Sequence, residues 1–200
     1  MKEVKVKDEK EVIGVNMIDD KKGEENSLKE SNKIHEYLEK ERIDLNCLKK
    51  MFEEEVNMDQ KIINDSFALA CDNPSTDLEI LEYMIDLKCK VNHKHQNGYT
   101  ALHYACLNDF DHKAEIINFL IEKNADLDAQ DILGETPLFL EVSNFESFNI
   151  EIIRTLVENK SDVNLENDRE MNAFEMITKN DQLDYGFFFF FFFSILFSYF

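Results

Sequence analysis

Five side chains of the kinds that bind metal ions lie in one short segment of the sequence. They are Cys89, His93, His95, His103 and Cys106. Thiolates and imidazoles are the usual ligands of zinc, and structural zinc sites space them as short pairs such as Cys-x-x-Cys. The five residues match no such spacing, so we predict neither a metal site nor a metal cofactor.

Motifs for catalysis are missing from the sequence. It contains no glycine-rich phosphate loop, no Gly-x-Ser-x-Gly turn and no His-Glu-x-x-His helix. Acidic neighbours such as Asp19 and Asp20 have nothing beside them that would desolvate them, so we interpret them as solvated residues. We therefore predict that the protein is not an enzyme and has no catalytic or cofactor-binding residues.

The overall charge narrows the choice of partners. The 200 residues include 22 Lys and Arg against 42 Asp and Glu, a formal net charge of −20. Such a chain lacks the basic surface that displaces counterions from nucleic acid, so nucleic acid is not expected as a partner. Hydrophobic residues make up 44% of the chain, and only 5 Gly and 2 Pro are present, which favours a helix-rich globular fold.

The cysteines indicate a reducing compartment. Residues 1–30 are charged and lack the apolar stretch of a secretory signal. Cys47, Cys71, Cys89 and Cys106 are therefore expected to be free thiols. We predict a cytoplasmic location, with the nucleus as the alternative.

Groups of residues recur along the chain at a spacing of 36. Repeats of 20–50 residues are typical of stacked architectures, in which each unit buries its apolar faces against its neighbours. The matching groups are Glu79–Leu81, Glu115–Ile117 and Glu151–Ile153, and Gly98 and Thr100 return as Gly134 and Thr136.

Each repeat is predicted to contain two helices. The second carries apolar residues at 116, 117, 120 and 121, which form one face of an α-helix. The first is expected to begin after a side chain whose oxygen can accept a free N–H of the first turn. These predicted caps are Asp65, Thr100, Thr136 and Asn172. Pro137 supports the third, because proline is well tolerated at the first helical position.

The repeats resemble a known family. Thr100-Ala101-Leu102-His103 and Thr136-Pro137-Leu138-Phe139 resemble the Thr-Pro-Leu-His motif of ankyrin repeats. Asn124-Ala125-Asp126-Leu127-Asp128 resembles the segment that ends the second helix in that family. The resemblance covers roughly residues 62–180. It implies an all-α solenoid of stacked helix–turn–helix repeats, in which His103 makes structural hydrogen bonds.

The spacing divides the chain into seven segments. We expect a disordered charged arm (1–32), degenerate N-terminal capping helices (33–61), repeats at 62–97, 98–133 and 134–169, a truncated repeat (170–181) and a Phe-rich tail (182–200). Lys88 and Lys160 occupy the position after the second helix where the family has glycine. A left-handed backbone there costs a non-glycine residue about 1–2 kcal/mol, so these repeats should be weaker than a consensus repeat.

The tail contains seven consecutive phenylalanines, Phe187 to Phe193. We interpret it as a sequence artefact, such as a poly-T tract read as Phe codons. A membrane anchor is one alternative, although 14 residues give about 21 Å of helix and a bilayer needs about 30 Å. An apolar cap on the last repeat is the other.

The family resemblance implies a non-catalytic protein-interaction module that binds through its turn tips and the exposed side of its first helices. The residues that we expect to contact a partner are His95, Tyr99, Tyr104, Asp131, Ile132, Leu133, Glu135 and Asp168. Ile132 and Leu133 are apolar at a tip that should be polar, so they either anchor a partner or pack against a neighbouring tip. The two tyrosines either contact the partner or fill space between repeats.

The predicted surface is acidic. Asp131, Glu135, Glu141, Glu166 and Asp168 contribute to it, so we expect a protein partner with a basic or basic and apolar segment. We predict a monomeric adaptor or scaffold away from the membrane. The alternatives are a truncated interaction arm of a larger signalling or ubiquitin-ligase-type protein and a tail-anchored regulator at a membrane surface.

Overall fold

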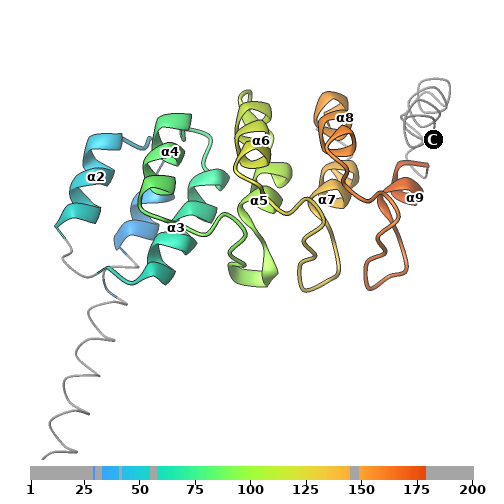
Figure 1. Cartoon of the computed structure of the whole chain (residues 1–200), viewed down its shortest axis with the longest axis horizontal. Helices are drawn as coiled ribbons and strands as arrows, with labels where there is room; N and C mark the ends of the chain where they lie inside the picture. Colours follow the sequence, from blue (N-terminus) through green and yellow to red (C-terminus); the bar gives the residue numbers. More distant parts are fainter. Residues whose placement is uncertain (1–28, 30–32, 41, 55–57, 145–148, 179–200) are drawn as a thin grey trace, which may run out of the picture.

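The molecule is a row of helix pairs (Figure 1). The computed structural model describes residues 29, 33–40, 42–54, 58–144 and 149–178. These ranges contain helices, turns and loops but no strand, so the predicted all-α repeat solenoid is confirmed. The predicted disordered arm, except residue 29, and the whole Phe-rich tail lie outside the described residues, as do the last residues of the truncated repeat.

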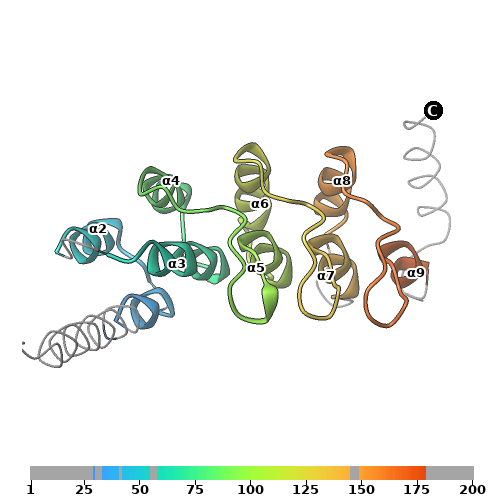
Figure 2. The same ribbon diagram turned by 60° about the horizontal axis from the view of Figure 1, so that its bottom comes forward.

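The helices alternate between two rows (Figure 2). One row holds the first helices of successive repeats, α3 (Gln60–Asp72), α5 (Ala101–Leu107), α7 (Pro137–Ser143) and α9 (Ala173–Thr178). The other holds α2 (Leu45–Glu53), α4 (Leu78–Asp86), α6 (Lys113–Glu122) and α8 (Ile150–Glu158). A short 3-10 turn, η1 (Gln96–Gly98), precedes α5, and residues 33–38 form a further helix ahead of α2.

A continuous apolar core joins the repeats. The first helices α3, α5 and α7 each pack against the first helix of the next repeat and against their own second helix. Every helix from α3 to α8 contributes a large side chain that is almost fully buried: Phe67, Leu81, Leu102, Leu120, Leu138 and Leu156. Because each pair is buried only by its neighbours, stability is shared along the row. Among the described residues, no helix has the length and apolar character needed to cross a bilayer.

Three first helices begin at the residues that the sequence indicates. The Thr136 hydroxyl accepts a hydrogen bond from Phe139 N at 3.1 Å, and the Asn172 side chain accepts one from Glu175 N at 2.9 Å. Thr100 forms a capping box with His103. Free N–H groups of the first turn are satisfied at each of these starts.

The predicted cap at Asp65 is wrong. Helix α3 begins at Gln60, and Asp59 caps it by accepting a hydrogen bond from Lys61 N at 2.9 Å. Ile62 and Ile63 extend the buried face upstream, with side chains 4% and 8% exposed, so the helix gains an extra turn before Asp65. The Asp65 carboxylate instead lies 2.7 Å from Nε2 of His93.

The second helices end in left-handed residues, where the sequence lacks glycine. Lys88, Asn124 and Lys160 have φ angles of 63°, 62° and 78°. In α6 the following amide, Ala125 N, donates to Leu120 O at 2.9 Å, which satisfies a carbonyl that the helix would leave free.

Candidate functional site

Three loops extend from one edge of the stack (Figures 1 and 2). We define the first, second and third tips as residues 93–99, 129–135 and 165–171. A backbone hydrogen bond closes each tip at the same register. The bonds are His95 N to Tyr99 O (2.7 Å), Asp131 N to Glu135 O (3.0 Å) and Asn167 N to Met171 O (2.9 Å).

Backbone hydrogen bonds also join each tip to the next. Ile132 N donates to Asn97 O at 2.9 Å, and Asp168 N donates to Leu133 O at 2.9 Å. The Gln130 amide adds a bond to Glu166 O at 3.0 Å. With its polar backbone groups paired in this way, the edge is held as one ordered surface before any partner binds.

Ile132 and Leu133 lie on the solvent side of the second tip. Their side chains are 64% and 43% exposed, while their backbone groups take part in the bonds between tips. The neighbouring tips therefore do not cover them. Such exposure is unusual for large apolar residues on an ordered loop.

His95, Tyr99 and Tyr104 come together where the first tip meets α5. Tyr104 OH and His95 Nδ1 are 2.7 Å apart, and the two tyrosine rings meet edge to face at 5.5 Å between centroids. Tyr99 also stacks on His103 at 5.6 Å. Burial raises the pKa of Tyr104 to about 12, so its hydroxyl stays protonated at neutral pH. Both tyrosines are half-buried, so they fill space between tip and helix and remain partly exposed.

His103 connects two repeats. Its Nδ1 accepts a hydrogen bond from Thr100 N at 3.0 Å, so Nε2 carries the proton that is donated to Glu135 O at 3.1 Å. Burial lowers the pKa of His103, which keeps the ring neutral. The His103 ring therefore has a structural role, because its hydrogen bonds hold two repeats together.

Carboxylates surround the exposed apolar pair. Asp131 Oδ1 accepts hydrogen bonds from Leu133 N and Glu135 N, both at 2.8 Å, and thereby shapes the second tip. Burial, followed by the charge of Asp131, raises the pKa of Glu135. Glu166 and Asp168 are exposed on the third tip.

Glu141 does not belong to this acidic surface, so the prediction that placed it there is wrong. Its side chain is fully buried and pairs with Lys113, with Nζ 3.1 Å from Oε2. Asn149 N also donates to Oε1 at 2.7 Å. Glu141 follows Ala105 by one repeat spacing, and Ala105 is completely buried, so this register faces the interior.

The cysteines and histidines of the central segment do not converge on a common point. Cys106 is fully buried and its pKa lies well above the usual value, because burial disfavours the thiolate. Burial also raises the pKa of Cys89 to about 12. Within the ranges that the structure describes, no group of three or more potential ligands is arranged to hold a metal ion.

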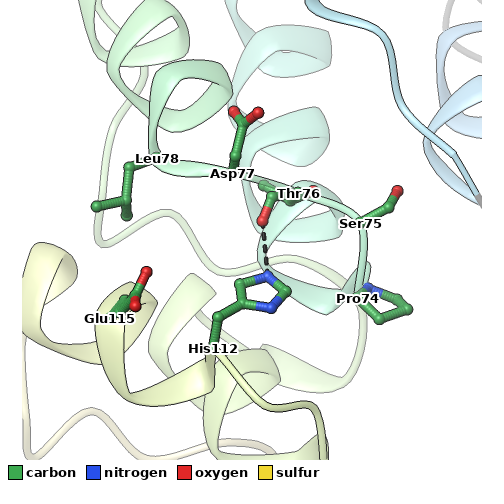
Figure 3. A pocket seen from close by; sticks show the side chains of 7 residues that line it. All are labelled: Pro74, Ser75, Thr76, Asp77, Leu78, His112 and Glu115. Atoms are coloured by element: carbon green, nitrogen blue, oxygen red, sulfur yellow. Dashed lines mark hydrogen bonds between the residues drawn. The ribbon is translucent and has the colours of Figure 1, made fainter.

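A separate pocket of about 210 Å³ lies at the helix ends remote from the tips, between the α3–α4 loop and the start of α6. Figure 3 shows the His112 ring directed at Thr76, whose carbonyl oxygen is 2.8 Å from Nε2. Leu78, Asp77 and Glu115 also line this pocket. The sequence predicts no partner contact for these residues.

Fold and tips together define a helical repeat protein. A family model of ankyrin repeats matches residues 67–167 as three copies, which is about half of the chain. The chain therefore belongs to the ankyrin repeat family. Ankyrin repeats are generally protein–protein interaction modules and are typically non-catalytic. A comparison with curated proteins found no match.

Proposed function

We propose that this protein is a non-catalytic adaptor or scaffold that binds a protein partner through its tips and the adjoining exposed side of its first helices. The observation that carries the proposal is the exposure of Ile132 and Leu133 on a backbone fixed by hydrogen bonds to both neighbouring tips. A fixed surface loses little conformational entropy on binding, so more of the contact energy appears as affinity.

The apolar pair supplies the binding energy in this proposal. Full burial of an Ile or Leu side chain contributes about 1.5–3 kcal/mol relative to full exposure. Both side chains are already part-covered, so burial by a partner should contribute about 1–2 kcal/mol each. Tyr99 and Tyr104 extend the contact at the first tip.

Charge supplies the selectivity. Asp131, Glu135, Glu166 and Asp168 border the apolar pair, and the whole chain has a net charge of −20. A partner segment with basic residues beside an apolar anchor complements this surface, and its association should slow as salt rises. We further propose that the protein acts as a monomer in the cytoplasm or nucleus, where its four cysteines stay reduced.

The test is capture of partners by the full chain and by the double variant Ile132→Ser/Leu133→Ser. Asn118→Ser is the control, since Asn118 is exposed but lies in α6, in the row of second helices and outside the tips. Each captured protein is purified and its affinity measured by calorimetry. The proposal predicts at least about tenfold weaker binding by the double variant, as loss of about 1.4 kcal/mol implies, and unchanged binding by the control. Equal affinity for the folded double variant and the wild type would remove the apolar pair from the binding site.

A further inference from the structure

Three of the five histidines lie close together at the N-terminal end of the stack. His35 belongs to the helix of residues 33–38, the blue helix beside α3 in Figure 2, and His93 and His95 belong to the first tip. The His35 and His95 rings meet edge to face, with centroids 6.3 Å apart and planes at 89°. This contact joins residues 33–38 to a tip that lies far away in the sequence.

Among the residues that the structure describes, only one of these imidazoles lies within hydrogen-bond distance of a carboxylate. His93 Nε2 lies 2.7 Å from the Asp65 carboxylate. His95 Nδ1 is bonded to the neutral Tyr104 hydroxyl. The Nε2 atom of His35 is buried and has no hydrogen-bond partner among the described residues. The His35 and His95 rings therefore fit this junction as neutral groups.

Other charges around the junction do not reverse this preference. Asp65 and Glu39 favour a proton on His35, and Asp65 and Asp72 favour one on His95. Burial outweighs them, so the pKa of each ring lies below 6.5. The charges of His35 and His93 further disfavour a proton on His95. Two tyrosines lie beside the junction, Tyr99 and Tyr104. Their pKa values are raised, so both hydroxyls stay neutral.

The helix of residues 33–38 depends on its docking. Ile34 and Leu38 are 2% and 1% exposed, and the Asn73 side chain donates to Leu38 O and Lys40 O at 2.6 and 2.7 Å. Leu38 also borders a hollow of about 200 Å³ with Leu69 of α3.

We propose that protonation of His35 and His95 releases the helix of residues 33–38 from the stack and uncovers the apolar side of α3. In the released chain both imidazoles are less buried, so their pKa values move toward the ordinary value of about 6.5 and the rings bind protons more readily than in the docked chain. The contribution of the two neutral imidazoles to docking is therefore complete above about pH 6.5 and is lost as the pH falls below that value. The inference concerns the free protein and does not depend on the proposed partner.

The test follows the methyl NMR signals of Ile34 and Leu38 in the full chain from about pH 7.5 to about pH 5, together with the imidazole signals. The ratio of docked to released helix should fall by up to about tenfold for each unit by which each imidazole pKa lies below 6.5. The signals of Ile152 and Leu156 in α8 should stay constant and serve as the internal reference.

Two variants separate this response from general acid effects. His35→Phe/His95→Phe keeps two rings that carry no charge, and it should abolish the response. His112→Phe removes an imidazole from the remote α3–α4 pocket and should retain it. A response that persists in the folded double variant would overturn the proposal. Constant Ile34 and Leu38 signals in the wild type while His35 and His95 titrate would also overturn it, whether or not the double variant folds.

Discussion

Lys113 and Glu141 form an ion pair that is buried between two repeats, with side chains only 4% and 0% exposed. Lys113 lies at the start of α6 and Glu141 in α7, and both carboxylate oxygens are within 3.2 Å of Nζ. The same carboxylate accepts from Asn149, the residue that caps α8. One pair of side chains therefore fixes the positions of three helices.

Removal of one partner of this pair should be costly. Lys113→Met leaves the Glu141 carboxylate buried without its cation, so the free energy of unfolding should fall by about 3–5 kcal/mol in urea titrations. The double variant Lys113→Met/Glu141→Leu removes both charges and should recover most of that loss, although Asn149 N loses its acceptor. A single variant that costs no more than a surface pair, about 1 kcal/mol or less, would show that the pair is not buried in solution.

Replacing a left-handed lysine by glycine should stabilise the folded protein. Lys160 has a φ of 78°, and Lys160→Gly should raise the free energy of unfolding by about 1 kcal/mol because glycine tolerates this conformation. Lys123→Gly is the control. Lys123 ends α6 with a φ of −87°, so glycine there should destabilise. If thermal melting shows the same sign of change for both variants, the backbone assignment at 160 is wrong.

Gly134 is required where the second and third tips meet. Its φ is 74°, and a Cβ there would lie 3.0 Å from Asn167 Cα, a backbone atom that cannot easily move. Gly134→Ala should lower the free energy of unfolding by more than about 1 kcal/mol. Gln96→Ala changes an exposed residue of the first tip and should remain within about 0.5 kcal/mol of the wild type. Equal melting temperatures for the two variants would contradict the close approach of the tips.

The buried His103 ring should contribute to the free energy of unfolding in a pH-dependent way. His103→Phe should cost about 1–3 kcal/mol near pH 7.5, because Thr100 N and Glu135 O lose their shared partner. Phe139 occupies the equivalent register one repeat later, so a ring of this size is compatible with the position.

The cost of His103→Phe should shrink as the pH falls. Burial lowers the pKa of His103 in the folded protein, so below about pH 6.5 the unfolded chain takes up a proton that the folded chain resists. The free energy of unfolding of the wild type therefore falls below about pH 6.5. The variant has no imidazole at position 103, so it lacks this part of the pH dependence. Paired urea titrations near pH 7.5 and 5.5 measure the difference, and a constant difference would contradict a neutral, buried ring.

Periodicity in the sequence predicts the helical stack, because the 36-residue register carries both the apolar faces and the cap residues at Thr100, Thr136 and Asn172. It misplaces the start of α3, since both Asp59 and Asp65 are good caps and only burial of the upstream Ile62 and Ile63 decides between them. Glu141 lies 36 residues after Ala105, and this repeat spacing indicates a buried position for Glu141.

Contacts between distant segments have no local signal in the sequence. The His35–His95 contact joins residues 60 positions apart through the docking of residues 33–38, and no periodic pattern indicates it. Exposure of Ile132 and Leu133 is similar, because the sequence shows two apolar residues at a turn but not whether a neighbouring tip covers them.

Chemical-shift mapping of the isotope-labelled protein with a captured and purified partner is the most direct test of tip-mediated binding. The account predicts that amide and methyl shifts concentrate in residues 93–99, 129–135 and 165–171, with the largest changes at the Ile132 and Leu133 methyls. Shifts that instead concentrate on the outer, exposed residues of α4, α6 and α8, with the tips unchanged, would contradict it.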